Sequence, residues 1–284
     1  MPVTRDDLVD ALAAYWGTKT LQLDNSRIAQ AVGAGTSGSV RGGKQFDPVA
    51  AIIAKFFIEA GYPASCIHVD RNLELPGYFR PSKKWDVVVS VDGVLVAAFE
   101  LKGLGGPSFG NNANNRVEEA LGSSMCLRRA ALADLYPGEQ PWVGYLFVME
   151  DASGSRKPVR VPRGTLRPDP IWEGQSYQGR FGITLKRLLD EKVYDSVCYL
   201  VSSASHPDPA EPVEALDWTH FAAAIRARIH YLAELGYPQK FACRQGAQGR
   251  IDISWPQDGT HPETEWLLPL DDPSAPEDER SARK

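Results

Sequence analysis

Long apolar runs are missing from this chain of 284 residues, and with them the usual signs of membrane insertion. A membrane-spanning helix needs about 20 consecutive apolar residues, and no window reaches that length. The opening segment, MPVTRDDLVDALAAYW, is acidic and polar where a secretory signal is basic and then apolar. These absences predict a cytoplasmic protein that has no membrane partner.

Clustered metal ligands of the zinc type are also missing. The four cysteines are scattered without a Cys-x-x-Cys pair, and the five histidines show no metal-binding spacing. We therefore expect no zinc site. In a reducing cytoplasm the cysteines should be free thiols.

The chain has no excess of positive charge, because its formal net charge is −5. The acidity is concentrated at the end: residues 257–284 carry 8 acidic and 3 basic side chains, which leaves 28 of each sign elsewhere. A groove of this neutral body could still be locally basic. We expect a single domain over residues 1–255, with a catalytic core at about 41–205, and a mobile acidic tail over 256–284.

Apolar periodicity predicts an α/β fold. DVVVSV and VLVAAFEL are joined at Asp92-Gly93, a strong hairpin signal. VGYLFVM and SVCYLVSS are further buried strands, and helices are expected at about 4–16, 26–32, 47–60, 112–135, 177–192 and from 217 onward. The fold class is therefore a mixed central sheet with an antiparallel hairpin, flanked by helices. In the 112–135 helix, the expected inward residues are Val117, Leu121, Met125, Leu132 and Leu135.

Two charges interrupt the apolar strand VLVAAFELKG. Glu100 and Lys102 lie two residues apart and so share a face, and Asp86 opens the other arm of the hairpin. Asp, a gap and then Glu-x-Lys is the PD-(D/E)-x-K pattern of metal-dependent phosphodiesterases. Two carboxylates bind Mg²⁺, which prefers oxygen ligands, and a lysine can orient and activate the attacking water. We expect Asp86, Glu100 and Lys102 to be catalytic, with the two carboxylates as metal ligands.

The pattern alone is weakly specific, since a surface ion pair at a strand end, worth at most about 1 kcal/mol, has the same residues. The hairpin context, the otherwise apolar strand and the polar helix that follows favour the catalytic interpretation. Geometry adds a condition. An unbroken two-residue hairpin would place Asp86 and Glu100 on opposite faces, because one step of register reverses every side chain. We therefore predict a three-residue loop or one β-bulge between them.

The following helix opens with an unusual polar segment, FGNNANNRVEEALGSS. Asn112, Asn115, Arg116 and Glu119 recur at helical spacing, and asparagines are poor helix formers that surface needs alone do not favour. Amides suit base edges, and arginine suits phosphate or guanine. We expect these four to face DNA or the active site, with a solvated helix face as the alternative.

Other candidate contacts lie in loops and at a helix end. Lys44 and Gln45 follow a glycine-rich loop, and Lys83 and Lys84 form a basic run before Asp86; all four are expected to contact DNA. Glu59 lies on the apolar side of its helix. It is either a further metal ligand or a solvated glutamate at the end of its helix, and the sequence leaves both interpretations open.

Several segments together resemble the XhoI-type restriction endonucleases: RGGKQFD, LPGYFRPSKKWDVVV, AAFELKGLGGPSFGNNANNRVEEALGSS and SYQGRFGITLKRLLDEKVYDSVCYLVSS. The resemblance covers roughly residues 41–203, and its asparagine-rich helix is the most specific part. It implies a restriction-endonuclease-like core and a homodimeric, Mg²⁺-dependent type II enzyme. Its substrate would be double-stranded DNA, cut within a short palindrome, and enzymes of this type read CTCGAG. A cognate methyltransferase would act on the same site without necessarily binding the enzyme.

Two other functions fit the same residues. A repair or junction nuclease could use the same metal site, and a DNA-binding module could retain the fold without activity. Intact Asp86, Glu100 and Lys102 argue against the second alternative.

Overall fold

The computed structural model describes residues 2–31, 44–69, 73–106, 109–138, 140–161 and 164–237. They belong to one compact unit, Met1–Gly246. The expected acidic tail lies outside the described residues. Within the described part of the chain, no helix combines the length and the apolar character needed to cross a membrane.

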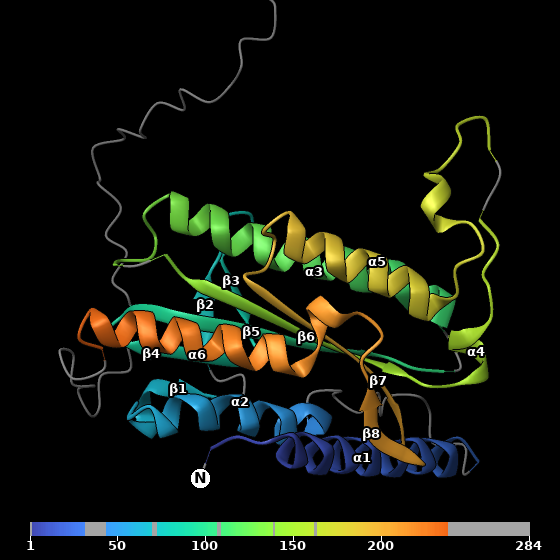
Figure 1. The fold of residues 1–284 in the computed structure, drawn as a ribbon, viewed down its shortest axis with the longest axis horizontal. Coiled ribbons are helices and arrows are strands. Elements are labelled where there is room, and N and C mark those ends of the chain that lie inside the picture. The colour runs from blue at the N-terminus through green and yellow to red at the C-terminus, as the bar shows by residue number, and fades with distance from the viewer. Residues whose placement is uncertain are drawn as a thin grey trace, which may run out of the picture. The chain divides into compact units, whose positions relative to one another are not determined.

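A six-stranded sheet in the order β1-β4-β5-β6-β7-β8 forms the centre (Figure 1). Its strands are β1 (Ile67–His68), β4 (Val87–Val91), β5 (Val94–Leu104), β6 (Trp142–Glu150), β7 (Ser196–Ser203) and β8 (His206–Ala210). β5, β6 and β7 are parallel, and the other neighbours are antiparallel. Two short strands, β2 (Glu74–Pro76) and β3 (Ser82–Lys84), form a separate antiparallel ribbon.

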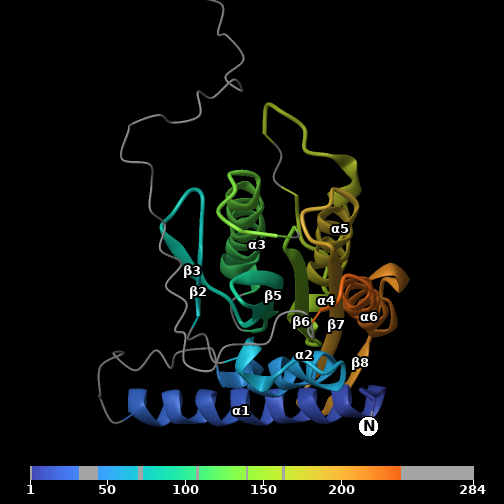
Figure 2. The same ribbon diagram turned by 90° about the vertical axis from the view of Figure 1, so that its left-hand side faces the viewer.

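Helices cover both faces of this sheet, which confirms the predicted fold class (Figures 1 and 2). The helices are α1 (Arg5–Ala31), α2 (Asp47–Glu59), α3 (Phe109–Leu132), α4 (Ser153–Arg156), α5 (Tyr177–Asp190) and α6 (Trp218–Glu234). One apolar core joins the sheet to α1, α2 and α6, and a second joins its other face to α3 and α5. The central strands read as continuous apolar runs because both their faces are buried.

The β4–β5 hairpin contains the predicted β-bulge. Val91 pairs with Val94 and Ser90 with Leu95, but Val89 pairs with Ala97, so Val96 has no partner on β4. The loop between Val91 and Val94 therefore has two residues. Asp92 and Gly93 both have positive φ (47° and 84°), which is the conformation of a type I′ turn.

Beyond the bulge, Val87 pairs with Phe99. Asp86 N donates to Phe99 O at 3.1 Å, so the next position places Asp86 opposite Glu100. The prediction of one bulge is confirmed, and the alternative of a three-residue loop is not formed.

The predicted inner face of α3 is wrong at three of its five residues, whereas Val117 is half-buried and Leu135, just beyond the helix, packs against the second core. Leu121, Met125 and Leu132 are 41%, 45% and 66% exposed. Apart from Phe109 at its start, the buried residues of α3 are mostly small: Ala120, Ser123, Ser124, Cys126, Leu127, Ala130 and Ala131. Small side chains let a helix approach its neighbours closely, and here that close approach decides which stripe faces inward.

Two further sequence predictions need correction. The helices expected at 4–16 and 26–32 form one continuous α1. Cys126 and Cys198 are free thiols as predicted, but Cys66 is disulfide-bonded. The spacing of scattered cysteines in a sequence does not reveal which of them meet in space.

Candidate active site

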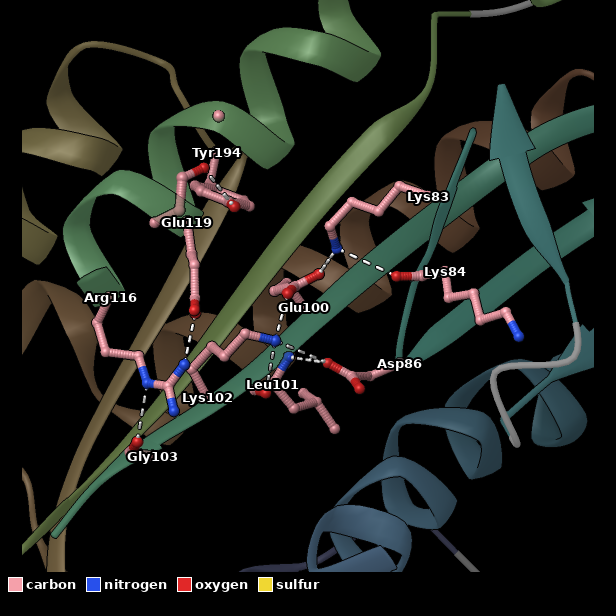
Figure 3. Close-up of polar contacts among 12 residues, drawn as sticks. Lys83, Lys84, Asp86, Glu100, Leu101, Lys102, Gly103, Arg116, Glu119 and Tyr194 are labelled. Carbon is pink, nitrogen blue, oxygen red and sulfur yellow. Dashed lines mark hydrogen bonds and ion pairs between the residues drawn. The ribbon is translucent and has the colours of Figure 1, made fainter. Parts of the chain in front are cut away.

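Asp86, Glu100 and Lys102 come together on the face of the sheet that α3 covers (Figure 3). Both carboxylates are buried, with 5% of Asp86 and 3% of Glu100 exposed. Asp86 Oδ2 accepts a hydrogen bond from the backbone N–H of Leu101 at 2.7 Å. Lys102 Nζ forms an ion pair with Glu100 Oε1 and lies 3.7 Å from Asp86 Oδ2. The lysine therefore bridges the two carboxylates.

A second lysine reaches the same glutamate. Lys83, on β3, donates from Nζ to Glu100 Oε2. The same ammonium lies 3.2 Å from Lys84 O and 4.4 Å from the centre of the Trp85 ring. Lys83 was expected to contact DNA, but in this structure its side chain turns inward to a carboxylate. Both oxygens of Glu100 thus carry an ammonium partner.

Two ammonium groups stabilise the ionised form of Glu100. Burial alone would raise the pKa of Glu100, but the nearby ammonium groups of Lys102 and Lys83 outweigh it and hold that pKa below its usual value. Burial lowers the pKa of Lys83, and the attraction of Glu100 only partly offsets this. Tyr145 is buried close by, and burial followed by the charge of Glu100 raises its pKa well above the ordinary value. That phenol stays neutral beside the cluster.

These groups open into a cleft of about 510 Å³ between the hairpin, α3 and the β2–β3 ribbon. Its lining is strongly charged: Gln45, Phe46, Arg80, Lys83, Lys84, Asp86, Glu100, Leu101, Lys102, Gly103, Arg116, Glu118, Glu119, Gly122 and Ser123. Of the predicted DNA contacts, five belong to this lining: Gln45, Lys83, Lys84, Arg116 and Glu119. Lys44, Asn112 and Asn115 are exposed outside it.

Arg116 is held in place within the cleft. Its Nε donates to Gly103 O at 3.2 Å, and its guanidinium pairs with Glu119 one turn along α3. Gly103 allows the close packing around this point, since a Cβ there would lie 2.5 Å from the Tyr15 hydroxyl. The predicted polar face of α3 is thus anchored to the end of β5.

Arg80 is a cleft residue that the sequence analysis missed. It lies in the tip of the β2–β3 ribbon and donates to Gly122 O on α3 at 3.5 Å. Tyr78 and Phe79 precede it and are exposed (43% and 71%). The basic run RPSKKW, with three cations within five residues, could have identified Arg80 as a candidate. The run does not show, however, that the Arg80 side chain lines the cleft.

The oxygen ligands present fit a magnesium ion. Asp86 and Glu100 offer two facing carboxylates, and Mg²⁺ typically uses one or two carboxylates while water and substrate phosphate complete its octahedron. Among the described residues no three His, Cys, Asp or Glu side chains cluster as a metal site. Glu59 is exposed at the end of α2 and does not line the cleft, so the structure does not join it to the two carboxylates.

Comparison with known proteins identifies the relatives of this chain. The family model described as restriction endonuclease XhoI matches residues 26–210. The chain is similar to the type II restriction enzyme BstVI of Geobacillus stearothermophilus, at 38% identity over 59% of this chain and 78% of that enzyme. It is equally similar to the type II restriction enzyme XhoI of Xanthomonas vasicola (38%, over 63% of this chain and 72% of that enzyme). AbrI of Azospirillum brasilense is 38% identical over 52% of this chain and 67% of its own length. No solved structure matches the chain.

Proposed function

The chain belongs to the XhoI family of restriction endonucleases, and from this membership we propose that it hydrolyses double-stranded DNA with Mg²⁺ at Asp86 and Glu100. The observation that supports the proposal is the bulged hairpin, which places these buried carboxylates opposite one another with Lys102 between them. We propose CTCGAG as the site, on the similarity to XhoI.

In this mechanism Asp86 and Glu100 would hold the cation, which would supply Lewis-acid stabilisation of the phosphate and favour ionisation of the attacking water. Lys102 is positioned to orient the attacking water and to stabilise its ionised form. Arg116 and Lys84 provide positive charge for the flanking phosphates. The buried face behind Glu100 limits access of bulk water, which strengthens these interactions.

The assembly and its context are also part of the proposal. A palindrome is most simply read by a two-fold symmetric protein, so we propose a homodimer on DNA. A separate methyltransferase would protect host DNA at the same site, and both would act in the cytoplasm. We propose that residues 1–255 form the endonuclease domain and that 256–284 form a tail outside it.

Plasmid digestion tests the proposal. With Mg²⁺ the protein should give discrete bands, and sequencing their ends identifies the site and the cut position. Asp86→Asn, which keeps an acceptor for Leu101 N–H, and Lys102→Met should each reduce cleavage by at least about 10³-fold, the scale of losing one main electrostatic or acid–base group. Asp190→Asn, on the exposed end of α5, is the control. Full activity of Asp86→Asn, or nicking governed by DNA structure and not by sequence, would contradict the assignment.

A further inference from the structure

Lys83 enters the cluster from a different element than its partners. Asp86, Glu100 and Lys102 belong to the β4–β5 hairpin, whereas Lys83 lies on the β2–β3 ribbon beside α3 (Figures 2 and 3). Neighbouring side chains of a strand point to opposite sides, and the next residue shows the contrast. Lys84 is 57% exposed and lies 3.6 Å from Glu74, while Lys83 is only 16% exposed and pairs with Glu100.

The charges of the four groups cancel. Two carboxylates face two ammonium groups, and both oxygens of Glu100 already accept from an ammonium. A divalent cation that binds Glu100 therefore competes with these ammonium groups for the same two oxygens. Lys102 is near both carboxylates, since Asp86 Oδ2 lies 3.7 Å away, whereas Glu100 is the only carboxylate among the described residues with which Lys83 forms an ion pair. Lys83 thus has one carboxylate partner where Lys102 has two, and its other contacts are a neutral carbonyl and an aromatic ring, so it can leave Glu100 without breaking a second ion pair.

We propose that Lys83 competes with the metal ion for Glu100 in the DNA-free protein and, once displaced, becomes a catalytic contact to the phosphate in the cleft. The inference rests on the proposed function. A partly buried ammonium that loses its carboxylate needs a new anionic partner, and Lys83 already lines the cleft where that phosphate would lie. Metal and DNA thus each favour the binding of the other, because a coupling between two ligands is reciprocal.

Two measurements of opposite sign test this role. Calorimetric titration of the DNA-free protein with Mg²⁺ should show Lys83→Met binding at least about tenfold more tightly than the wild type, because a unit positive charge beside the ion is gone. Single-turnover cleavage at saturating Mg²⁺ should nevertheless fall at least about tenfold in the same variant, with no recovery on adding more metal. A merely structural lysine would weaken both properties together.

Matched variants complete the experiment. Lys186→Met removes the same charge from α5, outside the cleft, and should leave the Mg²⁺ affinity of the DNA-free protein unchanged. Lys83→Arg, which keeps the charge, should restore wild-type Mg²⁺ affinity, and melting temperatures verify that each variant is folded. If folded Lys83→Met binds Mg²⁺ no more tightly than the wild type, or cleaves equally fast, the inference is overturned. Asp86→Asn separates the two ideas: if it still binds Mg²⁺ like the wild type, the proposed metal site itself is wrong.

Discussion

Deleting one residue of the hairpin should leave the carboxylate pair aligned if the residue is Val96. Val96 has no partner on β4, so its removal makes the ladder regular and keeps Val89 opposite Ala97. Asp86 then still faces Glu100. The cost comes from one buried valine, about 2 kcal/mol, and from the hydrogen bond that Arg228 donates to Val96 O at 3.3 Å, about 1 kcal/mol. At most about 3 kcal/mol should be lost, or about 6–12 °C in melting temperature.

Deleting Ser90 from the opposite strand is the matched comparison. Keeping Asp86 opposite Glu100 would then require two unpaired residues in β5. With regular pairing Asp86 lies opposite Ala98, which moves it two residues, or about 7 Å, along the strand. Mg²⁺ binding and plasmid cleavage of the two deletion variants, each tested for folding by circular dichroism, compare the outcomes. A folded Val96 deletion variant that has lost Mg²⁺ binding would refute the register argument.

Three further outcomes are expected. Leu127→Ala should cost about 2–5 kcal/mol in chemical denaturation because Leu127 is buried on α3, whereas Leu132→Ala should change stability by less than about 0.5 kcal/mol; equal effects would mean that the inner face of α3 is misassigned. Arg116→Ala should weaken DNA binding in a gel-shift assay by about tenfold, the size expected for one charged contact, and unchanged affinity would return Arg116 to a purely structural role. The affinity for DNA should fall steeply between 50 and 200 mM salt, by about 10³-fold or more if six or more phosphates are contacted, and a flat salt response would contradict binding through the charged cleft.

How far the sequence predicts this site depends on how local each contact is. Asp86, Glu100 and Lys102 belong to one hairpin, so the two-residue period and the Asp92-Gly93 turn were enough to require either a bulge or a three-residue loop that brings the three together. The DNA contact expected of Lys83 stays a prediction, but its ion pair with Glu100 was not foreseen, because the β2–β3 ribbon is a separate sheet from the hairpin. No short-range pattern contains that information.

The prediction of which side of α3 faces the sheet was wrong for a related reason. Leu121, Met125 and Leu132 have helical spacing and are larger than most of the residues buried along α3. Hydrophobicity favours burying the side of the helix with large apolar side chains, but close approach to the sheet favours the side with small residues, which contains Ala120. A single sequence does not contain the distance between a helix and its sheet. Predictions of whole strands and helices were more successful. The patterns that identify the hairpin and the apolar strands each lie within about ten consecutive residues.

The two-residue turn of the hairpin also affects the order in which the protein folds. Asp86 and Glu100 are joined by a short, tightly closed loop, and hairpins of this kind form within about 1–10 μs. The parallel pairs β5–β6 and β6–β7 instead close longer loops with intervening helices, and such non-local contacts form slowly. We expect the two carboxylates to meet early in folding, while water still solvates them, and α3 to bury them afterwards. In pulse-labelling hydrogen exchange, the amides of β4 and of the facing half of β5 should be protected before those of β7.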